Sequence, residues 1–289
     1  MNQHIQTNTL SALKGSIRER LMAFYDERES SQLVKILFFD ILGINATDLI
    51  SKAEHRLSES EILKLHFATK RLLKGEPVQY VTGKSYFAGL ELIVGPDVLI
   101  PRPETEELVR KICSDIESNE CSVLDIGTGS GCIALGIKSL RPTWKVSACD
   151  VSEMALNIAK RNVEKTKLHI NLFKLNVLDS SVLPEKYDVI VSNPPYIPWR
   201  EKGSLSSRVI DFEPHLALFV EDQHPLIFFE RILHLAQKYL HDDGVVFFEI
   251  HESFAAELTA LKDKYPIATI EVYKDMQGKD RMVKIKLSK

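Results

Sequence analysis

Val123-Leu-Asp-Ile-Gly-Thr-Gly-Ser-Gly131 is the strongest local indication of the fold class in this chain. It begins as a typical buried strand, and glycines at every second position then form a turn that opens a helix. In open α/β sheets, ligands bind where such a strand ends and the next helix begins. Glycines allow unusual backbone angles and let a ligand approach the main chain. The stretch therefore predicts an α/β domain that binds a ligand.

Around this stretch, segments that favour strands alternate with segments that favour helices. We expect strands near residues 122–126, 145–149, 171–175, 187–192, 244–250, 267–273 and 281–287, and helices near 131–140, 152–165, 225–240 and 252–263. This alternation favours a parallel sheet with helices on both faces. Only Lys274–Asp280 separates the last two strands, which is too short for a parallel crossover. The seventh strand should therefore be antiparallel.

The first ~75 residues predict a compact set of helices. Apolar residues recur at the spacing of one helix face at Leu10, Leu13, Ile17, Leu21 and Phe24. A second helix is expected over about Ser30–Leu42, ended by Gly43, and a third from the capping box of Ser58 and Glu61 to Leu73. This part carries no catalytic motif, so recognition, a lid and a structural role all remain open.

Residues 78–100 favour β structure and are expected to form a hairpin that joins the two parts. The expected strands are Val78–Thr82, Tyr86–Phe87 and Leu90–Val94, with glycines between them. Pro101-Arg-Pro-Glu-Thr-Glu106 then predicts a stiff, extended turn that leads into a helix. The chain is thus divided into a helical domain of residues 1–76, a linker of residues 77–101 and an α/β domain of residues 102–289.

Composition and charge exclude several classes of protein. The chain has 289 residues and a net charge of −3 without a block of Lys and Arg, whereas a nucleic-acid-binding protein usually carries a basic face. No apolar run approaches the roughly 20 residues of a membrane span, and the N-terminus lacks a secretory signal, so we expect a cytoplasmic protein. The cysteine spacing fits neither a zinc site nor a disulfide framework, with cysteines at Cys113, Cys121, Cys132 and Cys149.

The glycine turn favours S-adenosylmethionine over other nucleotides. A dinucleotide fingerprint needs a glycine at the position of Cys132, and a phosphate-binding P-loop needs a lysine at the position of Ile137. A GxGxG turn preceded by Asp125 suits a cofactor that has no pyrophosphate but carries cationic groups. Asp150 ends the next strand, where its carboxylate would accept the ribose hydroxyls. The cofactor-binding residues that this reasoning predicts are Gly127, Gly129, Gly131 and Asp150.

The adenine contacts follow the third strand. Asn176 is expected to hydrogen-bond the exocyclic amine of the adenine, and Leu178 to pack on the face of the ring. Asp179 is an alternative for the polar contact.

Asn193-Pro-Pro-Tyr196, at the end of the fourth expected strand, predicts the site of the methyl acceptor. Consecutive prolines stiffen the turn and remove two N–H donors, so the turn presents acceptors. The side-chain oxygen of Asn193 and the carbonyl of Pro194 would accept the two hydrogens of an amide or amino group. Tyr196 would stack on the planar group. We therefore predict Asn193, Pro194 and Tyr196 as catalytic residues, with Pro195 as a further substrate contact.

Two other interpretations stay open at this point. A nucleic-acid N-methyltransferase would use the same pocket on a flipped base, and would need a basic groove. A non-catalytic binding protein with the same fold would need a decayed glycine turn or acceptor motif, and both motifs are intact.

Over nearly its whole length, the chain resembles the HemK/PrmC family of release factor glutamine methyltransferases. The resemblance rests on Gln79–Gly83, Val98–Glu106, Asp125–Gly131, Asp150–Ser152, Val191–Ile197, Glu213–Leu218 and Asp275–Arg281. It implies a Rossmann-like, seven-stranded S-adenosylmethionine-dependent methyltransferase domain, a β-hairpin linker and a small N-terminal helical domain that recognises the substrate. It also implies which residues bind the cofactor: Gly127, Thr128, Gly129, Ser130, Gly131, Asp150, Leu178 and Asn193. In the family, Asn176 stands near a position that is often Asp and Leu178 where an aromatic residue can occur, which leaves the adenine contacts open.

The resemblance also implies the reaction. A methyl group would pass from S-adenosylmethionine, leaving S-adenosylhomocysteine, to the side-chain amide nitrogen of the glutamine in the Gly-Gly-Gln motif of class I peptide chain release factors. The expected partner is therefore a protein, with neither a membrane nor a nucleic acid as substrate.

Overall fold

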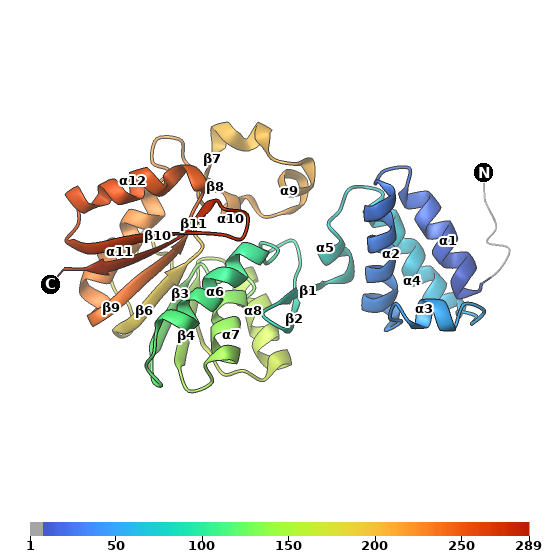
Figure 1. Cartoon of the computed structure of the whole chain (residues 1–289), viewed down its shortest axis with the longest axis horizontal. Coiled ribbons are helices and arrows are strands. Elements are labelled where there is room, and N and C mark those ends of the chain that lie inside the picture. Colours follow the sequence, from blue (N-terminus) through green and yellow to red (C-terminus); the bar gives the residue numbers. More distant parts are fainter. Residues whose placement is uncertain (1–7, 289) are drawn as a thin grey trace. The chain divides into compact units, whose positions relative to one another are not determined.

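A computed structural model describes residues 8–288 of the chain. These residues form two compact units, one that ends at Lys84 and one that begins at Ser85 (Figure 1). One hydrophobic cluster lies in the first unit and two lie in the second. The division into a helical domain of residues 1–76, a linker of residues 77–101 and a catalytic domain of residues 102–289 stays a prediction.

The first unit is helical. Its helices are α1 (Leu10–Leu21), α2 (Glu27–Leu42), α3 (Asp48–Ser51), α4 (Glu59–Leu72) and α5 (Val78–Thr82). Ser58 and Glu61 form the predicted capping box before α4, and Gly43 ends α2 in the left-handed region with a φ of 71°. The prediction that Phe24 lies on the buried face of the first helix is wrong, because α1 ends at Leu21 and Phe24 is 54% exposed.

The segment Val78–Thr82 corrects a second prediction, because it forms the short helix α5 instead of a strand. Gly83, with a φ of 72°, ends this helix in the left-handed region. The guanidinium of Arg71 in α4 donates to the carbonyl oxygens of Tyr80 and Val81, at 3.0 and 3.1 Å, and so satisfies acceptors at the end of the helix. These contacts override the β propensity of the segment.

The predicted hairpin consists of β1 (Lys84–Phe87) and β2 (Leu90–Ile93). The two connecting residues, Ala88 and Gly89, both have positive φ, at 49° and 78°, which is the conformation that two-residue hairpin turns require. The backbone N–H of Ala88 donates to the Glu106 carboxylate at 2.8 Å, and the side-chain amide of Asn162 bonds both the N–H and the carbonyl of Ile93. The hairpin is therefore tied to the helices of the second unit.

The second unit contains the predicted seven-stranded sheet. Its strand order is β10 (Ile267–Lys274), β11 (Asp280–Leu287), β9 (Leu240–Glu249), β6 (Tyr187–Ser192), β3 (Ser122–Ile126), β4 (Lys145–Asp150) and β5 (Asn171–Lys174). The pairs between β5 and β9 along this order are parallel, whereas β11 is antiparallel to both of its neighbours. The prediction of an antiparallel seventh strand is confirmed, and that strand inserts between β10 and β9.

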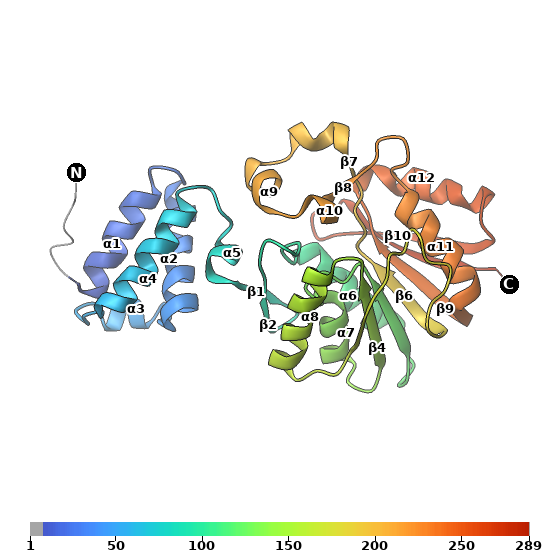
Figure 2. The same ribbon diagram turned by 180° about the vertical axis from the view of Figure 1, so that it is seen from behind.

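Helices cover both faces of the sheet, as predicted (Figures 1 and 2). One face packs on α6 (Pro103–Asp115) and α7 (Cys132–Leu140), and the other on α11 (Ile227–Tyr239) and α12 (Ala255–Ala260). Helix α8 (Glu153–Thr166) contacts β2, β4 and β5. Within β3, Val123 belongs to one hydrophobic cluster and Leu124 to the other, as the alternation of side chains along a strand requires.

The segment between β6 and α11 contains elements that the sequence analysis did not predict. They are β7 (Ile197–Pro198), the 3-10 helix η1 (Trp199–Ser204), α9 (Ser207–Phe212), α10 (His215–Leu218) and β8 (Phe219–Val220). Strands β7 and β8 pair in parallel, and the rings of Trp199 and Phe219 stack with their centroids 4.4 Å apart. Each element is too short to show a period in the sequence.

Within the described part of the chain, no helix has the length and apolar character to span a membrane.

Candidate active site

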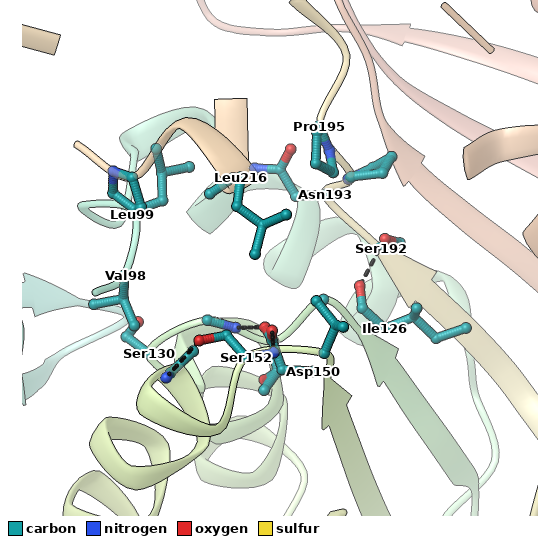
Figure 3. A pocket seen from close by; sticks show the side chains of 18 of the residues that line it. Val98, Leu99, Ile126, Ser130, Asp150, Ser152, Ser192, Asn193, Pro195 and Leu216 are labelled. Carbon is teal, nitrogen blue, oxygen red and sulfur yellow. Dashed lines mark hydrogen bonds between the residues drawn. The ribbon is translucent and has the colours of Figure 1, made fainter. Parts of the chain in front are cut away.

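A pocket of about 280 Å³ lies in the second unit, where the central parallel strands end (Figure 3). Its walls come from residues 96–102, 126–130, 150–152, 175–177 and 192–195. Further lining residues are Thr105 of α6, Pro214, Leu216 and Ala217, and residues of α7, α8 and α11. The pocket therefore brings together the glycine turn, Asp150 and the Asn-Pro-Pro turn, which the sequence analysis singled out separately. It also includes Pro96–Arg102 and Pro214, Leu216 and Ala217, to which that analysis gave no role in the site.

The glycine turn is built from left-handed backbone conformations. Gly127, Gly129 and Gly131 have φ values of 76°, 55° and 82°. A side chain at Gly127 or Gly129 would meet no atom within 4 Å, so the main chain there is open to a ligand. A Cβ at Gly131 would lie 3.4 Å from the Cβ of Ala159 in α8, and Gly131 does not line the pocket. The third glycine thus serves the packing of the turn.

Asp150 ends β4 and is braced by the main chain. One carboxylate oxygen accepts from the N–H of Gly129, and the other from the N–H of Ser152, each at 2.9 Å (Figure 3). An ionised carboxylate has about four acceptor positions, so further positions remain for a ligand in the pocket. Burial raises the pKa of Asp150, while the backbone hydrogen bonds oppose this shift. The arrangement suits a ligand that donates a pair of hydroxyl groups.

Asp125 stabilises the glycine turn from behind and does not line the pocket. Its Oδ2 accepts from the hydroxyl of Thr128 at 2.6 Å and from the N–H of Ala134 at 3.3 Å. Burial raises its pKa to about 7. Ser130 lines the pocket, and among the described residues its buried hydroxyl oxygen has no hydrogen-bond partner. Ser130 is therefore the polar side chain of the turn that is left for a ligand.

The residues after β5 are placed differently from one another. Asn176 lines the pocket together with Leu175 and Val177, and its amide group bonds Asp179 and the N–H of Leu178. Leu178 and Asp179 are not among the lining residues, and Leu178 packs against the hydrophobic cluster of the sheet. Leu175 and Val177 are therefore the apolar residues that follow β5 in the pocket wall.

The Asn-Pro-Pro turn follows β6. Asn193, Pro194 and Pro195 line the pocket, and Figure 3 shows the side chains of Asn193 and Pro195 at its rim. Tyr196 is not a lining residue; its hydroxyl lies 3.5 Å from a carboxylate oxygen of Glu249, and its ring packs against the sheet cluster. The structure thus brings three of the four predicted acceptor residues to the pocket.

Buried polar groups that the sequence analysis missed hold Asn193. Its side-chain nitrogen donates to the hydroxyl oxygen of Thr105 at 3.2 Å, and Thr105 donates to Glu249 Oε2 at 2.6 Å. Thr105 and Glu249 are each 2% exposed. Thr105 lies in the Pro101–Glu106 segment and Glu249 ends β9, so each belongs to an element that the sequence predicts. The sequence spacing gives no indication that the two side chains meet.

A second link of this kind joins two walls of the pocket. The buried Glu213 accepts from the N–H of Ile100 at 3.1 Å and pairs with the guanidinium of Arg102. These contacts tie residues 96–102 to the segment that precedes α10.

In the described residues, no group of three or more His, Cys, Asp and Glu is placed to hold a metal.

Comparison with known proteins places the chain among methyltransferases. A family model described as the PrmC N-terminal domain matches residues 16–83, and one described as the methyltransferase small domain matches residues 105–211. A methyltransferase from Pyrococcus furiosus has a similar structure (TM-score 0.52, 22% identity, covering 68% of this chain and 88% of that one). The hMettl16 catalytic domain, solved with an RNA hairpin, is similar too (TM-score 0.56, 20% identity, 80% and 83%). These likenesses show the predicted Rossmann-like methyltransferase fold.

Curated relatives match nearly the full chain. The release factor glutamine methyltransferase of Flavobacterium psychrophilum is 36% identical over 271 residues, which cover 92% of this chain and 95% of that protein. The enzyme of the same name from Bacteroides thetaiotaomicron is 37% identical over 275 residues, with 95% and 99% covered. The predicted resemblance is thus confirmed. This chain belongs to the release factor glutamine methyltransferase family.

Proposed function

We propose that this protein transfers a methyl group from S-adenosylmethionine to the side-chain amide nitrogen of the glutamine in the Gly-Gly-Gln motif of class I peptide chain release factors. The similarity to release factor glutamine methyltransferases supports this function. The observation that carries it is that the glycine turn, Asp150 and the Asn193–Pro195 turn line one pocket. A donor and an acceptor bound to these parts would lie side by side.

The residues present fit S-adenosylmethionine, which supplies an activated methyl group on a sulfonium. The main chain is open over Gly127 and Gly129, the Asp150 carboxylate has free acceptor positions, and the Ser130 hydroxyl has no partner among the described residues. Asp150 would accept from the ribose hydroxyls, and residues 127–130 would line the amino-acid portion. Asn176 and Val177 would contact the adenine, with Gly131 and Leu178 supporting these parts from outside the pocket.

The Asn193–Pro195 turn would bind the glutamine amide through hydrogen-bond acceptors alone. The side-chain oxygen of Asn193 and the carbonyl of Pro194 would each accept one hydrogen of the amide, and the prolines contribute no competing N–H. An amide nitrogen is a poor nucleophile because its lone pair is delocalised. Two acceptors stabilise the partial positive charge that this nitrogen gains during transfer, so they act mainly in the transition state. Tyr196, behind the turn, would support it rather than stack on the substrate.

Mass spectrometry after incubation with labelled cofactor tests the activity. Release factor, purified DNA and ribosomal RNA are offered separately, together with a release factor whose motif glutamine is replaced by asparagine. We expect one methyl group on the glutamine of the intact motif and none on the replaced factor. Methylation of nucleic acid without methylation of release factor would contradict the proposal and favour an enzyme that acts on a flipped base.

We further propose that residues 1–76 recognise the release factor, that residues 77–101 link the two parts, that residues 102–289 catalyse the reaction, and that the enzyme acts in the cytoplasm. The motifs for cofactor and acceptor all lie in the second unit, while the first unit carries none. Residues 85–289 are expected to bind S-adenosylmethionine in calorimetry but to methylate release factor poorly. Full activity of this shorter chain would contradict the recognition role of the N-terminal helices.

A further inference from the structure

The half-buried amide of Asn193 ends a chain of hydrogen bonds that continues through two buried side chains, Thr105 and Glu249. Its Nδ2 lies 3.2 Å from the Thr105 hydroxyl oxygen, which lies 2.6 Å from Glu249 Oε2. The three residues come from the end of β6, the first turn of α6 and the end of β9. Thr105 lines the pocket but is only 2% exposed, as is Glu249, so the hydrogen bond between these two residues is shielded from water.

The hydrogen bonds of this chain have only one direction when Glu249 is ionised. A carboxylate only accepts, so the single hydrogen of the Thr105 hydroxyl goes to Glu249. The Thr105 oxygen can then only accept, and it must face the NH2 group of Asn193 rather than the carbonyl oxygen. The Asn193 oxygen is thereby left on the side of the pocket. This orientation follows from the donor and acceptor inventory, independently of the similar shapes of the two ends of an amide.

We propose that Thr105 and Glu249 are positioning residues that orient the Asn193 amide so that its oxygen, not its nitrogen, faces the methyl acceptor. The proposal rests on the proposed function, in which the acceptor is an amide NH2. An Asn193 amide turned by half a rotation would present its own NH2 to the NH2 of the substrate, and two donors cannot bond each other. We call the chain Asn193–Thr105–Glu249 the amide relay.

Charged and titratable groups around Glu249 make the amide relay sensitive to pH. The positive charge of Arg281 in β11 lowers the pKa of Glu249, and the negative charge of Glu104 in α6 raises it. The Tyr196 hydroxyl lies beside Glu249 Oε1, the carboxylate oxygen that does not bond Thr105. Cys132 of α7 stays neutral, because burial raises its pKa to about 12. The balance of these effects is dominated by burial, which raises the pKa of Glu249 to about 7.

Protonation of Glu249 would reverse the relay. A protonated carboxyl can donate to the Thr105 oxygen, which frees the hydrogen of that hydroxyl to donate to Asn193 and favours the turned amide. Turnover of the wild-type enzyme is therefore expected to fall as the pH decreases from about 8 to 6, through the pKa of Glu249.

The sharpest test compares Thr105→Val with Thr105→Ser in the full-length enzyme. Valine keeps the shape of threonine but lacks the hydroxyl, whereas serine keeps the hydroxyl. We expect kcat on release factor to fall about 10–100-fold in Thr105→Val, the range seen when a group that orients a functional residue is lost, with the KM for S-adenosylmethionine unchanged. Thr105→Ser should recover most of the kcat. Thermal unfolding of both variants controls for the fold.

Equal kcat for the wild type and Thr105→Val, or equal loss in both variants, would overturn the amide relay. Glu249→Gln gives an independent measurement should Thr105→Val fold poorly. Glutamine is neutral at every pH, so at saturating S-adenosylmethionine this variant should show a much shallower decrease in kcat between pH 8 and 6. The part that remains is assigned to Asp125, whose pKa burial raises to about 7. A decrease as deep as that of the wild type would also overturn the proposal. The wild-type enzyme separates the two proposals. If it does not methylate release factor at all, the proposed function is contradicted. If it is active and the variants do not behave as expected, only the amide relay is contradicted.

Discussion

The cofactor half of the pocket is held by hydrogen bonds between residues close in sequence, whereas the acceptor half is held by bonds between distant ones. In the cofactor half, the partners of Asp150 lie 2 and 21 residues away, and Asp125 bonds Thr128, 3 residues away. In the acceptor half, Asn193 and Thr105 are 88 residues apart, and Thr105 and Glu249 are 144 residues apart. The first half needs two neighbouring strands, β3 and β4, and the turn between β3 and α7, whereas the second needs the ends of β6 and β9 and the start of α6.

The two halves also differ in what faces the ligand. The cofactor half offers main chain and one carboxylate that two backbone N–H groups hold in place. The acceptor half offers a side-chain amide whose orientation depends on other side chains. Substitutions in the cofactor half should therefore change binding, and substitutions in the acceptor half should change turnover. Each of the following measurements would sharpen or break this separation.

The largest effect is expected for Asn193→Ala, which removes the acceptor oxygen while Pro194 and Pro195 keep the turn. We expect kcat on release factor to fall by about 10²–10³, as for the loss of one preorganised polar group, with a modest loss of cofactor affinity. Asn193→Asp is the matched variant, because it keeps an acceptor oxygen and should retain more activity than alanine. Near-normal turnover of Asn193→Ala would break the comparison, since the acceptor half would then not control catalysis.

The next effect concerns Asp150→Ala in the cofactor half. We expect S-adenosylmethionine to bind more weakly by about 1.5–3 kcal/mol, because charge-assisted hydrogen bonds to the ribose are lost. Calorimetry of the folded variant measures the change directly, and Asn193→Ala serves as the control from the other half. Unchanged affinity in Asp150→Ala would remove this carboxylate from the cofactor site.

The smallest effect is on stability and has a defined pH dependence. The folded protein raises the pKa of Glu249 from an ordinary 4.5 to about 7, so over this range it binds a proton more firmly than the unfolded chain does. Stability is therefore lost as the pH rises from about 4.5 to 7. Glu249→Gln cannot lose a proton, so it should be more stable than the wild type above pH 7, by about 1–3 kcal/mol, with no such gain near pH 5.

Thermal unfolding at pH 5 and pH 8 measures this difference. A gain of that size corresponds to a few degrees in Tm for a unit of this length. The exposed Glu257 of α12 is the matched control, since Glu257→Gln changes the same charge without removing a buried carboxylate. A pH-independent difference for Glu249→Gln would show that Glu249 remains ionised throughout. In that case, orienting Asn193 through Glu249 would cause no pH-dependent loss of stability.

Local signals predicted most of the second unit. The strand before Gly127, the glycine turn and Asp150 follow from residue periods and backbone geometry, and the length of Lys274–Asp280 decided the direction of the last strand. Where local signals conflicted with packing, the prediction was wrong. Val78–Thr82 has β propensity, yet Arg71 and Gly83 stabilise it as a helix.

The direction of side chains just after the ends of strands was harder to predict from the sequence. Leu178 and Tyr196 stand beside pocket residues in sequence, but neither lines the pocket. Asn193 lines it, and so does Val177, which belongs to the sheet cluster as well. A strand fixes the direction of its side chains through its alternation, but the irregular backbone after it does not. The direction of each such residue therefore depends on which neighbours it meets.

The sheet, the glycine turn and the position of Asn193 at a strand end could be predicted from the sequence, because these depend on neighbouring residues along the chain. The contacts of Thr105 and Glu249 with Asn193, and of Glu213 with Arg102, became known from the folded structure alone. The reason is physical: a buried hydrogen bond depends on the positions of two groups in space, and nothing in the spacing of residues 105, 193 and 249 encodes that a helix start meets the ends of two strands there. Packing of α6 against β9 and β6 brings them together.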